Sequence, residues 1–224
     1  MNLTDRAYRE LRTAIVSLRI RPGERLDSGR IGASLGFSRA PVVEALNMLR
    51  AEGLVTSRRR VGTFATEVGR DRIDEVFDAR EMIEQRVAPV VIRNVSDRQI
   101  DDLADLLGEA AALLETAGAG FDYPRFMELD QRFHAELIRL SERAIYVKWF
   151  EELAAHMQRV RHLFTGNPLP RSREGHREHE AILAALRGRD VERLRAALLD
   201  HTRRSRAGAE DILTVREGAG TPAG

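Results

Sequence analysis

Residues 1–70 contain three stretches with helical periodicity and one that alternates like a β-hairpin. Residues 4–19 predict a first helix. Thr4 is a possible N-cap at its start, and the apolar side chains fall on one stripe, namely Ala7, Leu11, Ile15 and Leu18. After a Pro-Gly turn, the segments 28–36 and 38–53 predict two short helices joined by a glycine-containing turn. The stretch 54–68, "LVTSRRRVGTFATEV", alternates as a hairpin does. This order of elements predicts a helix-turn-helix followed by a wing.

From residue 71 to 206 the pattern is helical throughout, with no strand-like alternation. Turns such as "AGAGFDYP" and "TGNPLPRS" separate the segments, and the expected helices are 71–93, 97–116, 124–141, 143–164, 173–187 and 190–206. The sequence therefore predicts a mainly α protein. We expect a winged helix-turn-helix domain over 1–70, an all-helical antiparallel bundle over 71–206, and a flexible tail over 207–224.

Composition indicates a soluble globular protein. Of its 224 residues, 43% are hydrophobic and 32% are charged, which suffices for one large core or two small ones. The chain has no run of about 18 apolar residues and no charged-then-apolar leader, so we expect a cytoplasmic location and no membrane insertion. The absence of cysteine excludes disulfides and thiolate metal sites.

Positive charge gathers in the amino-terminal part. Residues 1–70 hold 13 arginines and lysines against 7 acidic residues, whereas the remainder holds 23 against 28. Arg39 stands at the amino-terminal end of the second helix of the motif, where a guanidinium can donate two hydrogen bonds to guanine. Arg58, Arg59 and Arg60 lie near the hairpin tip and suit phosphate contacts. An isolated charged run is usually a solvated turn, but its place after a helix-turn-helix favours DNA.

Two polar residues interrupt the apolar face of the segment "MELDQRFHAELIRLS". At about 100° per residue, Asp130 and His134 fall within the apolar arc, which is otherwise made by Met127, Leu129, Phe133, Leu137, Ile138 and Leu140. A buried carboxylate without a partner is strongly unfavourable or becomes protonated. The two residues therefore need partners from another part of the chain.

Two further histidines are suitable partners. His179 falls among apolar residues of helix 173–187, and His201 among those of helix 190–206. Because a tight turn joins these helices, both side chains stand roughly 13 to 17 Å from the corner. A lone histidine on an apolar face is usually a hydrogen-bonded core residue. Three imidazoles and the Asp130 carboxylate instead favour a divalent metal, with zinc first and nickel, manganese or iron as alternatives.

A second polar pair faces the core on the helix 71–93. Arg80 projects into an apolar arc, with Glu84 one turn later. An internal salt bridge is one explanation. A buried guanidinium beside a metal site also suits a carboxylate-bearing ligand, because its fork binds that group at two points.

Several segments together resemble a known family. "RPGERL", "LGFSRAPVVEALNMLRAEGLV", "DQRFH" and "EHEAILAALRGRD" are similar to a GntR-family transcriptional regulator of the FadR type with an FCD effector-binding domain, over about residues 5–206. The resemblance implies a homodimer, a palindromic operator in double-stranded DNA, and a metal that contacts a small carboxylate-bearing effector. By this resemblance, the metal ligands are Asp130, His134, His179 and His201. The residues that contact the effector are Arg80 and Glu84.

The resemblance also bears on the DNA-binding residues. We expect Asn47, on the same helix as Arg39, and the wing glycine Gly62 to belong to that set. The chain departs from the family where an arginine is usual, at Val43 and Gly29, so the usual operator consensus should not be assumed. Pro89 replaces a common alanine and predicts a kink or an early helix end.

The predicted function is a ligand-responsive transcriptional regulator rather than an enzyme. Two alternatives stay open at this point. Three histidines and an aspartate around an open metal could serve a metal-dependent enzyme, although no HExxH-like general base accompanies them. The metal could also be purely structural, which coordination by four protein ligands with no room for another would favour.

Overall fold

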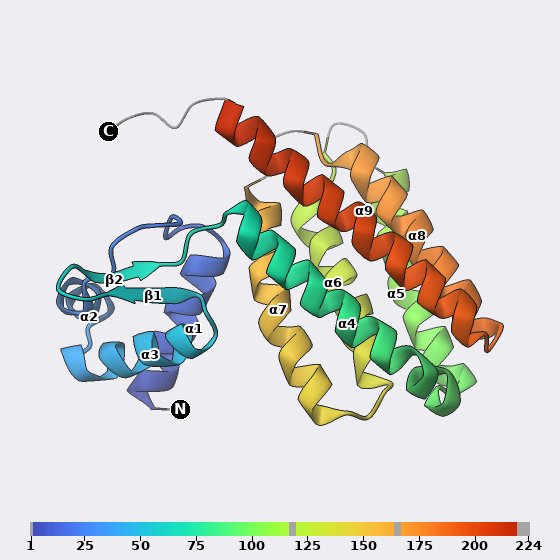
Figure 1. Cartoon of the computed structure of the whole chain (residues 1–224), viewed down its shortest axis with the longest axis horizontal. Helices are drawn as coiled ribbons and strands as arrows, with labels where there is room; N and C mark the ends of the chain where they lie inside the picture. Colours follow the sequence, from blue (N-terminus) through green and yellow to red (C-terminus); the bar gives the residue numbers. More distant parts are fainter. Residues whose placement is uncertain (1, 117–119, 164–166, 219–224) are drawn as a thin grey trace. The chain divides into compact units, whose positions relative to one another are not determined.

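The computed structural model describes residues 2–116, 120–163 and 167–218 (Figure 1). Its chain divides into two compact units. The first comprises residues 1–72 together with 155–163, and the second comprises 73–154 together with 164–224. Each unit has its own buried core, so each is described separately.

The first unit is the expected winged helix. Helices α1 (Leu3–Val16), α2 (Ser28–Leu35) and α3 (Arg39–Ala51) precede strands β1 (Val55–Arg58) and β2 (Gly62–Ala65). The strands pair antiparallel, with Arg58 opposite Gly62 and Val55 opposite Ala65. Helix α3 packs between α1 and α2, and its core cluster includes Ala7, Leu11, Ile15, Val42, Leu46 and Leu49.

Local chemistry sets the ends of these helices. Asn2 caps α1, since its side chain accepts a 2.7 Å hydrogen bond from the backbone N–H of Asp5. The expectation that Thr4 caps this helix was wrong, because the Thr4 hydroxyl donates to Glu44 of α3 at 2.8 Å. Gly36 ends α2 in the left-handed region at φ 70°, which allows the tight turn into α3.

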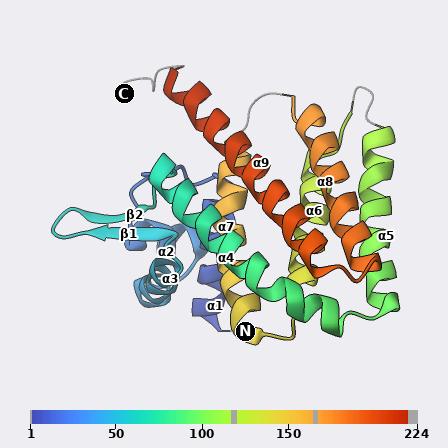
Figure 2. The same cartoon turned by 45° about the vertical axis from the view of Figure 1, so that its right-hand side comes forward.

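The second unit is an all-helical bundle (Figure 2). It contains most of α4 (Arg70–Asn94), all of α5 (Asp97–Glu115) and α6 (Tyr123–Arg139), and the beginning of α7 (Ala144–His162). Helices α8 (Leu169–Arg187) and α9 (Val191–Gly218) form an antiparallel hairpin, and α8 also packs on α5. The buried apolar side chains include Ile83, Val87, Leu103, Leu129, Phe133, Leu137, Phe150, Ile182 and Leu198.

The expectation of a flexible tail over 207–224 was wrong for its first part. Residues 207–218 do not begin a flexible tail but continue α9, where Ala209 and Leu213 are buried one turn apart. Residues 219–224 of the expected tail lie outside the described residues. Helix α4 continues past Pro89 to Asn94, so the proline does not end it. Among the described helices, none is both long and apolar enough to cross a bilayer.

Candidate metal centre and nucleic-acid interface

One exposed stripe of α3 carries Arg39 and Asn47, which the sequence assigns to DNA binding, with Val43 between them. Arg39, Val43 and Asn47 follow at four-residue spacing, and all three are exposed. Arg39 Nε donates to Ser28 Oγ at 3.0 Å, and Arg50 Nη1 donates to Asn47 Oδ1 at the same distance. Neither contact buries the side chain, so both groups stay available to a partner.

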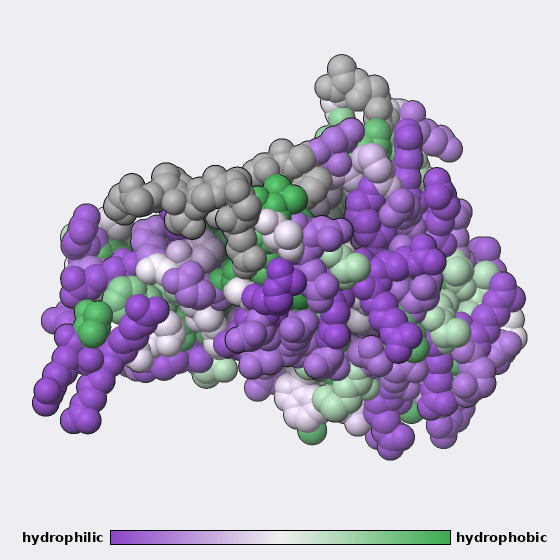
Figure 3. Space-filling model, turned by 45° about the horizontal axis from the view of Figure 1, so that its top comes forward, coloured by the Kyte–Doolittle hydropathy of each residue, from purple (hydrophilic) through white to green (hydrophobic). Residues whose placement is uncertain are grey.

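The wing carries three consecutive arginines, one that stacks on an aromatic ring and two in the turn between the strands. Arg58 lies over the Phe64 ring, 5.0 Å from its centroid, whereas Arg59 and Arg60 are exposed in the turn between the strands. Hydrophilic side chains project into solvent at the hairpin end of this unit (Figure 3). Gly62 has a structural reason to be glycine. Its φ is 140°, and an added Cβ would lie 3.1 Å from Arg25 Nε.

Three buried histidines meet inside the second unit. His134 on α6, His179 on α8 and His201 on α9 each offer a ring nitrogen, and these nitrogens lie within 4.8 Å of one another. The Nε2 atoms of His134 and His179 are 3.0 Å apart. Asp130 lies one turn before His134 and places Oδ1 3.6 Å from His179 Nε2. The structure thus brings together the three expected histidines, whereas Asp130, the fourth expected ligand, lies beside His179 but outside this group of three.

His201 is oriented by a carboxylate on the neighbouring helix. Its Nδ1 lies 2.7 Å from Glu178 Oε2, and both side chains are buried. Because a carboxylate can only accept, Nδ1 carries the proton and donates. The other ring nitrogen of His201, Nε2, has no hydrogen-bond partner among the described residues. The pKa of His201 lies well below its usual range. Burial is the largest cause, and the nearby His179 and Arg80 lower it further, so the ring is neutral at pH 7.

Arg80 and Glu84 form an ion pair next to the histidines. Arg80 Nε donates to Glu84 Oε1 at 2.8 Å, and both side chains are almost fully buried at 0% and 1% exposure. Thr202 donates to the other Glu84 oxygen at 2.7 Å. Arg80 Nη2 also lies 3.1 Å from His134 Nε2. The guanidinium therefore borders the histidine cluster, and its charge is compensated by Glu84.

The donor set fits a divalent metal. Neutral imidazoles and a carboxylate are the ligands of zinc and similar ions, and the site lacks thiolates because the chain has no cysteine. The orphaned Nε2 of His201 is the specific observation in favour, since buried ring nitrogens normally have partners. No donor in the set identifies which metal is preferred.

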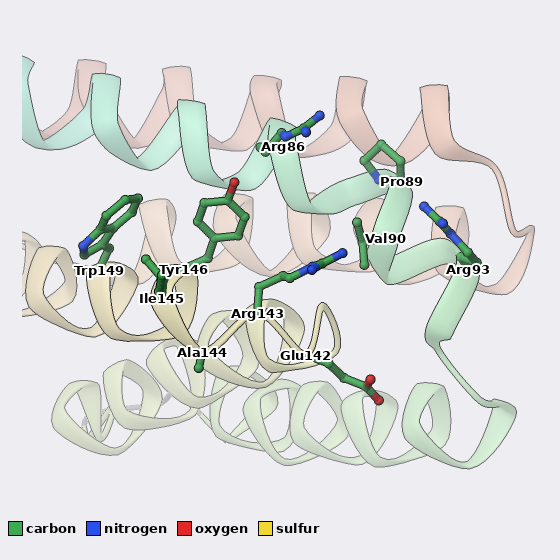
Figure 4. A pocket seen from close by; sticks show the side chains of 10 residues that line it. All are labelled: Arg86, Pro89, Val90, Arg93, Glu142, Arg143, Ala144, Ile145, Tyr146 and Trp149. Carbon is green, nitrogen blue, oxygen red and sulfur yellow. The ribbon is translucent and has the colours of Figure 1, made fainter.

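A separate hollow lies between α4 and the start of α7 (Figure 4). It has a volume of about 780 Å³ and shares no residue with the histidine cluster. Its lining combines arginines with apolar and aromatic side chains, namely Arg86, Pro89, Val90, Arg93, Glu142, Arg143, Ala144, Ile145, Tyr146 and Trp149. Ile145 and Trp149 are 63% and 45% exposed, which is unusual for side chains of this size.

Sequence reasoning missed the outer partners of the site. Glu178 directly precedes His179 but belongs to the same buried stripe of α8 as Gly175 and Ile182, which helical projection could have shown. Thr202, next to His201, gave no such signal. A buried threonine is compatible with an ordinary core position.

A DNA-reading winged helix and a helical bundle with a buried polar site, joined in one chain, define a class of DNA-binding transcriptional regulators. The matched families agree. Residues 3–65 match the family described as bacterial regulatory proteins, gntR family, and residues 75–204 match the FCD domain. The chain therefore belongs to the GntR regulators with an FCD domain, and the FadR-type assignment fits this domain.

Relatives of known name support the same conclusion. The chain is 27% identical over 206 residues to the Nta operon transcriptional regulator of Aminobacter aminovorans, covering 92% of each protein. It is 27% identical over 194 residues to the HTH-type transcriptional repressor RspR of Escherichia coli strain K12, covering 87% of this chain and 83% of that protein. The solved structure of E. coli McbR/YncC shares the fold, with a TM-score of 0.78, 23% identity and coverage of 94% and 98%. These families and relatives are regulators rather than enzymes.

Proposed function

We propose that this regulator is ligand-responsive and sequence-specific, and that its helical domain holds a divalent metal and a small organic acid. The observation that carries the proposal is the meeting of His134, His179 and His201 beside the Arg80 guanidinium. The Asp130 carboxylate lies 3.6 Å from His179. One polar atom of the cluster, His201 Nε2, is buried without a partner among the described residues, and such an atom is costly until something binds it. Because the same chain has a DNA-binding domain, ligand binding at this cluster would serve to regulate DNA binding.

The metal would be held by the three imidazoles and the Asp130 carboxylate, with zinc as the first candidate. A bound divalent ion supplies positive charge and Lewis acidity to an oxygen of the effector. Arg80 would contribute the second contact, because a guanidinium matches a carboxylate in both charge and geometry. A dicarboxylate, hydroxy acid or sugar acid carries both kinds of oxygen.

A structural metal without an effector is the second candidate, and one observation favours it. Arg80 is 0% exposed and already pairs with Glu84 at 2.8 Å. An effector must therefore compete with an internal carboxylate for the guanidinium. If it cannot, the cluster stabilises the bundle and the regulator takes its signal elsewhere.

The proposal includes a homodimer on a palindromic operator, with the face around the α4–α7 hollow as the contact surface. Met82 and Ile145 are 62% and 63% exposed, and Trp149 is 45% exposed, so these neighbouring helices present apolar side chains to solvent. Burying large apolar and aromatic side chains is what stabilises subunit contacts. Light scattering should give twice the 25.2 kDa chain mass, and Trp149→Glu should give the single-chain mass. A wild-type monomer at micromolar concentration would refute the dimer.

The metal is tested by elemental analysis and by titration of chelated protein with zinc, nickel and manganese. We expect about one ion per chain, lost in His179→Ala and retained in His176→Gln. His176 is the matched control, because it lies one turn earlier on α8 and belongs to no metal group among the described residues. A wild-type protein that binds none of these metals would leave the four residues as a buried polar network.

The effector is tested by screening small acids by thermal shift on the metal-loaded protein, then by operator binding. The operator is first selected from a random duplex library. An acid that binds at the cluster should change operator affinity about 5- to 150-fold, the usual range of coupling between sites. His179→Ala should remove this response and leave effector-free DNA binding intact. An effector that is uncharged, or a response that persists in His179→Ala, would refute the sensing model.

A further inference from the structure

We infer that Glu178 is the positioning residue of the metal site, and that it fixes His201 with its proton on Nδ1 and its Nε2 free to ligate. This inference rests on the proposed metal site and deepens it. Glu178 is no metal ligand in the arrangement predicted from the sequence. It acts through His201.

The first step is the geometry of the His201 ring. Glu178 Oε2 lies 2.7 Å from Nδ1, a short distance typical of a charge-assisted hydrogen bond. A neutral imidazole has one protonated nitrogen, so a proton held at Nδ1 leaves Nε2 with its lone pair exposed. That lone pair is on the atom without a partner among the described residues, and its ring lies 4.7 Å from each of the His134 and His179 rings, measured between centroids.

The second step is that Glu178 is itself held in place. Arg171 donates a hydrogen bond to each of its oxygens, with Nη1 3.0 Å from Oε1 and Nη2 3.1 Å from Oε2. Arg204 Nε lies 4.0 Å from Oε1. A bidentate pair fixes the plane of the carboxylate and directs its Oε2 at His201 Nδ1. Arg171 also reaches Ser205 of α9 at 3.4 Å, which ties the base of α8 to the helix that carries His201.

The third step excludes a plain structural ion pair as the whole explanation. Arg171 is 36% exposed on its side chain and could pair with a surface carboxylate, whereas Glu178 is 7% exposed and directed at a histidine. Carboxylates that orient ligating histidines in this way raise ligand basicity and fix the tautomer, and their loss typically lowers metal affinity about 10- to 100-fold.

The test compares zinc affinity in wild type, Glu178→Gln and Glu180→Gln, measured on the full chain by competition with a chelator. Glu180 is the matched control, because it is the same residue type two positions on, is 60% exposed and lies 3.8 Å from His176, which is not one of the proposed ligands. We expect about 10- to 100-fold weaker zinc binding in Glu178→Gln and no change in Glu180→Gln. Arg171→Gln, which keeps the Glu178 carboxylate, should give a smaller loss and serves if Glu178→Gln does not fold.

A second readout separates positioning from a mere loss of nearby negative charge. The ¹⁵N spectrum of histidine rings should show His201 protonated at Nδ1 in the metal-free wild type. Glutamine can donate as well as accept, so Glu178→Gln should shift His201 toward the other tautomer.

The outcomes are distinguishable. Wild type that binds zinc, together with a Glu178→Gln variant of equal affinity and unchanged tautomer, would overturn the role of Glu178 and leave the metal site standing. If Glu178→Gln is unfolded, equal affinity in Arg171→Gln overturns it. Wild type that binds no zinc, nickel or manganese overturns the metal site and this role together.

Discussion

The Arg80–Glu84 pair makes a quantitative prediction about the stability of the helical unit. Both side chains are almost completely buried, with Arg80 Nε 2.8 Å from Glu84 Oε1. Arg80→Met would remove the guanidinium and leave the Glu84 carboxylate with the Thr202 hydroxyl at 2.7 Å and His134 Nδ1 at 3.7 Å. An uncompensated buried charge of this kind costs about 3 to 5 kcal/mol, so the free energy of unfolding should fall by that amount.

The double variant Arg80→Met with Glu84→Leu should recover much of this loss. It removes the stranded carboxylate and fills the space with apolar groups, a change that is often nearly neutral for buried ion pairs. The remaining cost is the Thr202 hydroxyl without its acceptor, about 1 to 3 kcal/mol. The double variant should therefore be about 2 kcal/mol more stable than Arg80→Met alone.

Urea unfolding of the chelated protein measures these values. Trp149 is the chain's one tryptophan and lies in the helical unit, so its fluorescence follows that unit, while circular dichroism follows both. Chelation removes any metal contribution. A loss below about 1 kcal/mol in Arg80→Met, or strictly additive losses in the double variant, would refute the interpretation of the pair as charge-compensated and structural.

Other predictions concern DNA binding and pH. Arg39→Ala should cost about 1 to 3 kcal/mol on the selected operator and relax preference at one base pair, as measured by fluorescence anisotropy; wild-type affinity across a salt titration would refute this. Val43, 39% exposed on the same stripe, suits a thymine methyl. Thymine-to-uracil substitution in the operator should therefore weaken wild type but not Val43→Ala, and equal effects on both would contradict the contact. Changing Arg59 and Arg60 together to glutamine should weaken binding to all sequences and lower the salt slope by about 2; an unchanged slope would exclude phosphate contacts. Burial lowers the pKa of His156, so its folded form favours the neutral ring and the unfolded chain takes up the proton first. Stability should thus be lost as pH falls below about 6.5, with a shallower loss in His156→Gln by urea unfolding; identical pH profiles would refute it.

Periodicity was sufficient to predict the architecture, because each helix buries a stripe that repeats in the sequence. It placed the winged helix and the six later helices, and the projection of His179 and His201 predicted that they meet. The ends of elements were less predictable. The continuation of α9 through Leu213 was not predicted, because the end of the chain is rich in glycine and only two apolar positions indicate a helix there. The cap of α1 is Asn2 rather than Thr4, because the Asn2 side-chain oxygen is the one that reaches the Asp5 N–H.

The partners of the buried polar groups depend on tertiary packing, which local sequence does not encode. Arg80 and Glu84 were open to two explanations, and only their distance shows that they pair. Glu178 and His201 are 23 positions apart and meet because α8 and α9 are antiparallel. A pattern of hydrophobic positions identifies which side chains enter the core but not which of them touch.

The buried site also has a consequence for folding. His134, His179 and His201 are buried in the core of the helical unit, and His201 Nε2 has no hydrogen-bond partner among the described residues. A buried polar atom without a partner lowers stability until something binds it, and in this cluster that atom is His201 Nε2. A metal that binds the folded unit and not the unfolded chain restores this loss, by about 4.1 kcal/mol at a free concentration 1,000 times its dissociation constant. Because the winged helix has its own core and contributes none of the ligands, the helical unit should gain this stability while the winged helix gains none directly. In the proposed function, the metal would therefore satisfy the one ring nitrogen of the cluster that lacks a partner among the described residues, and the stability gained would report its binding.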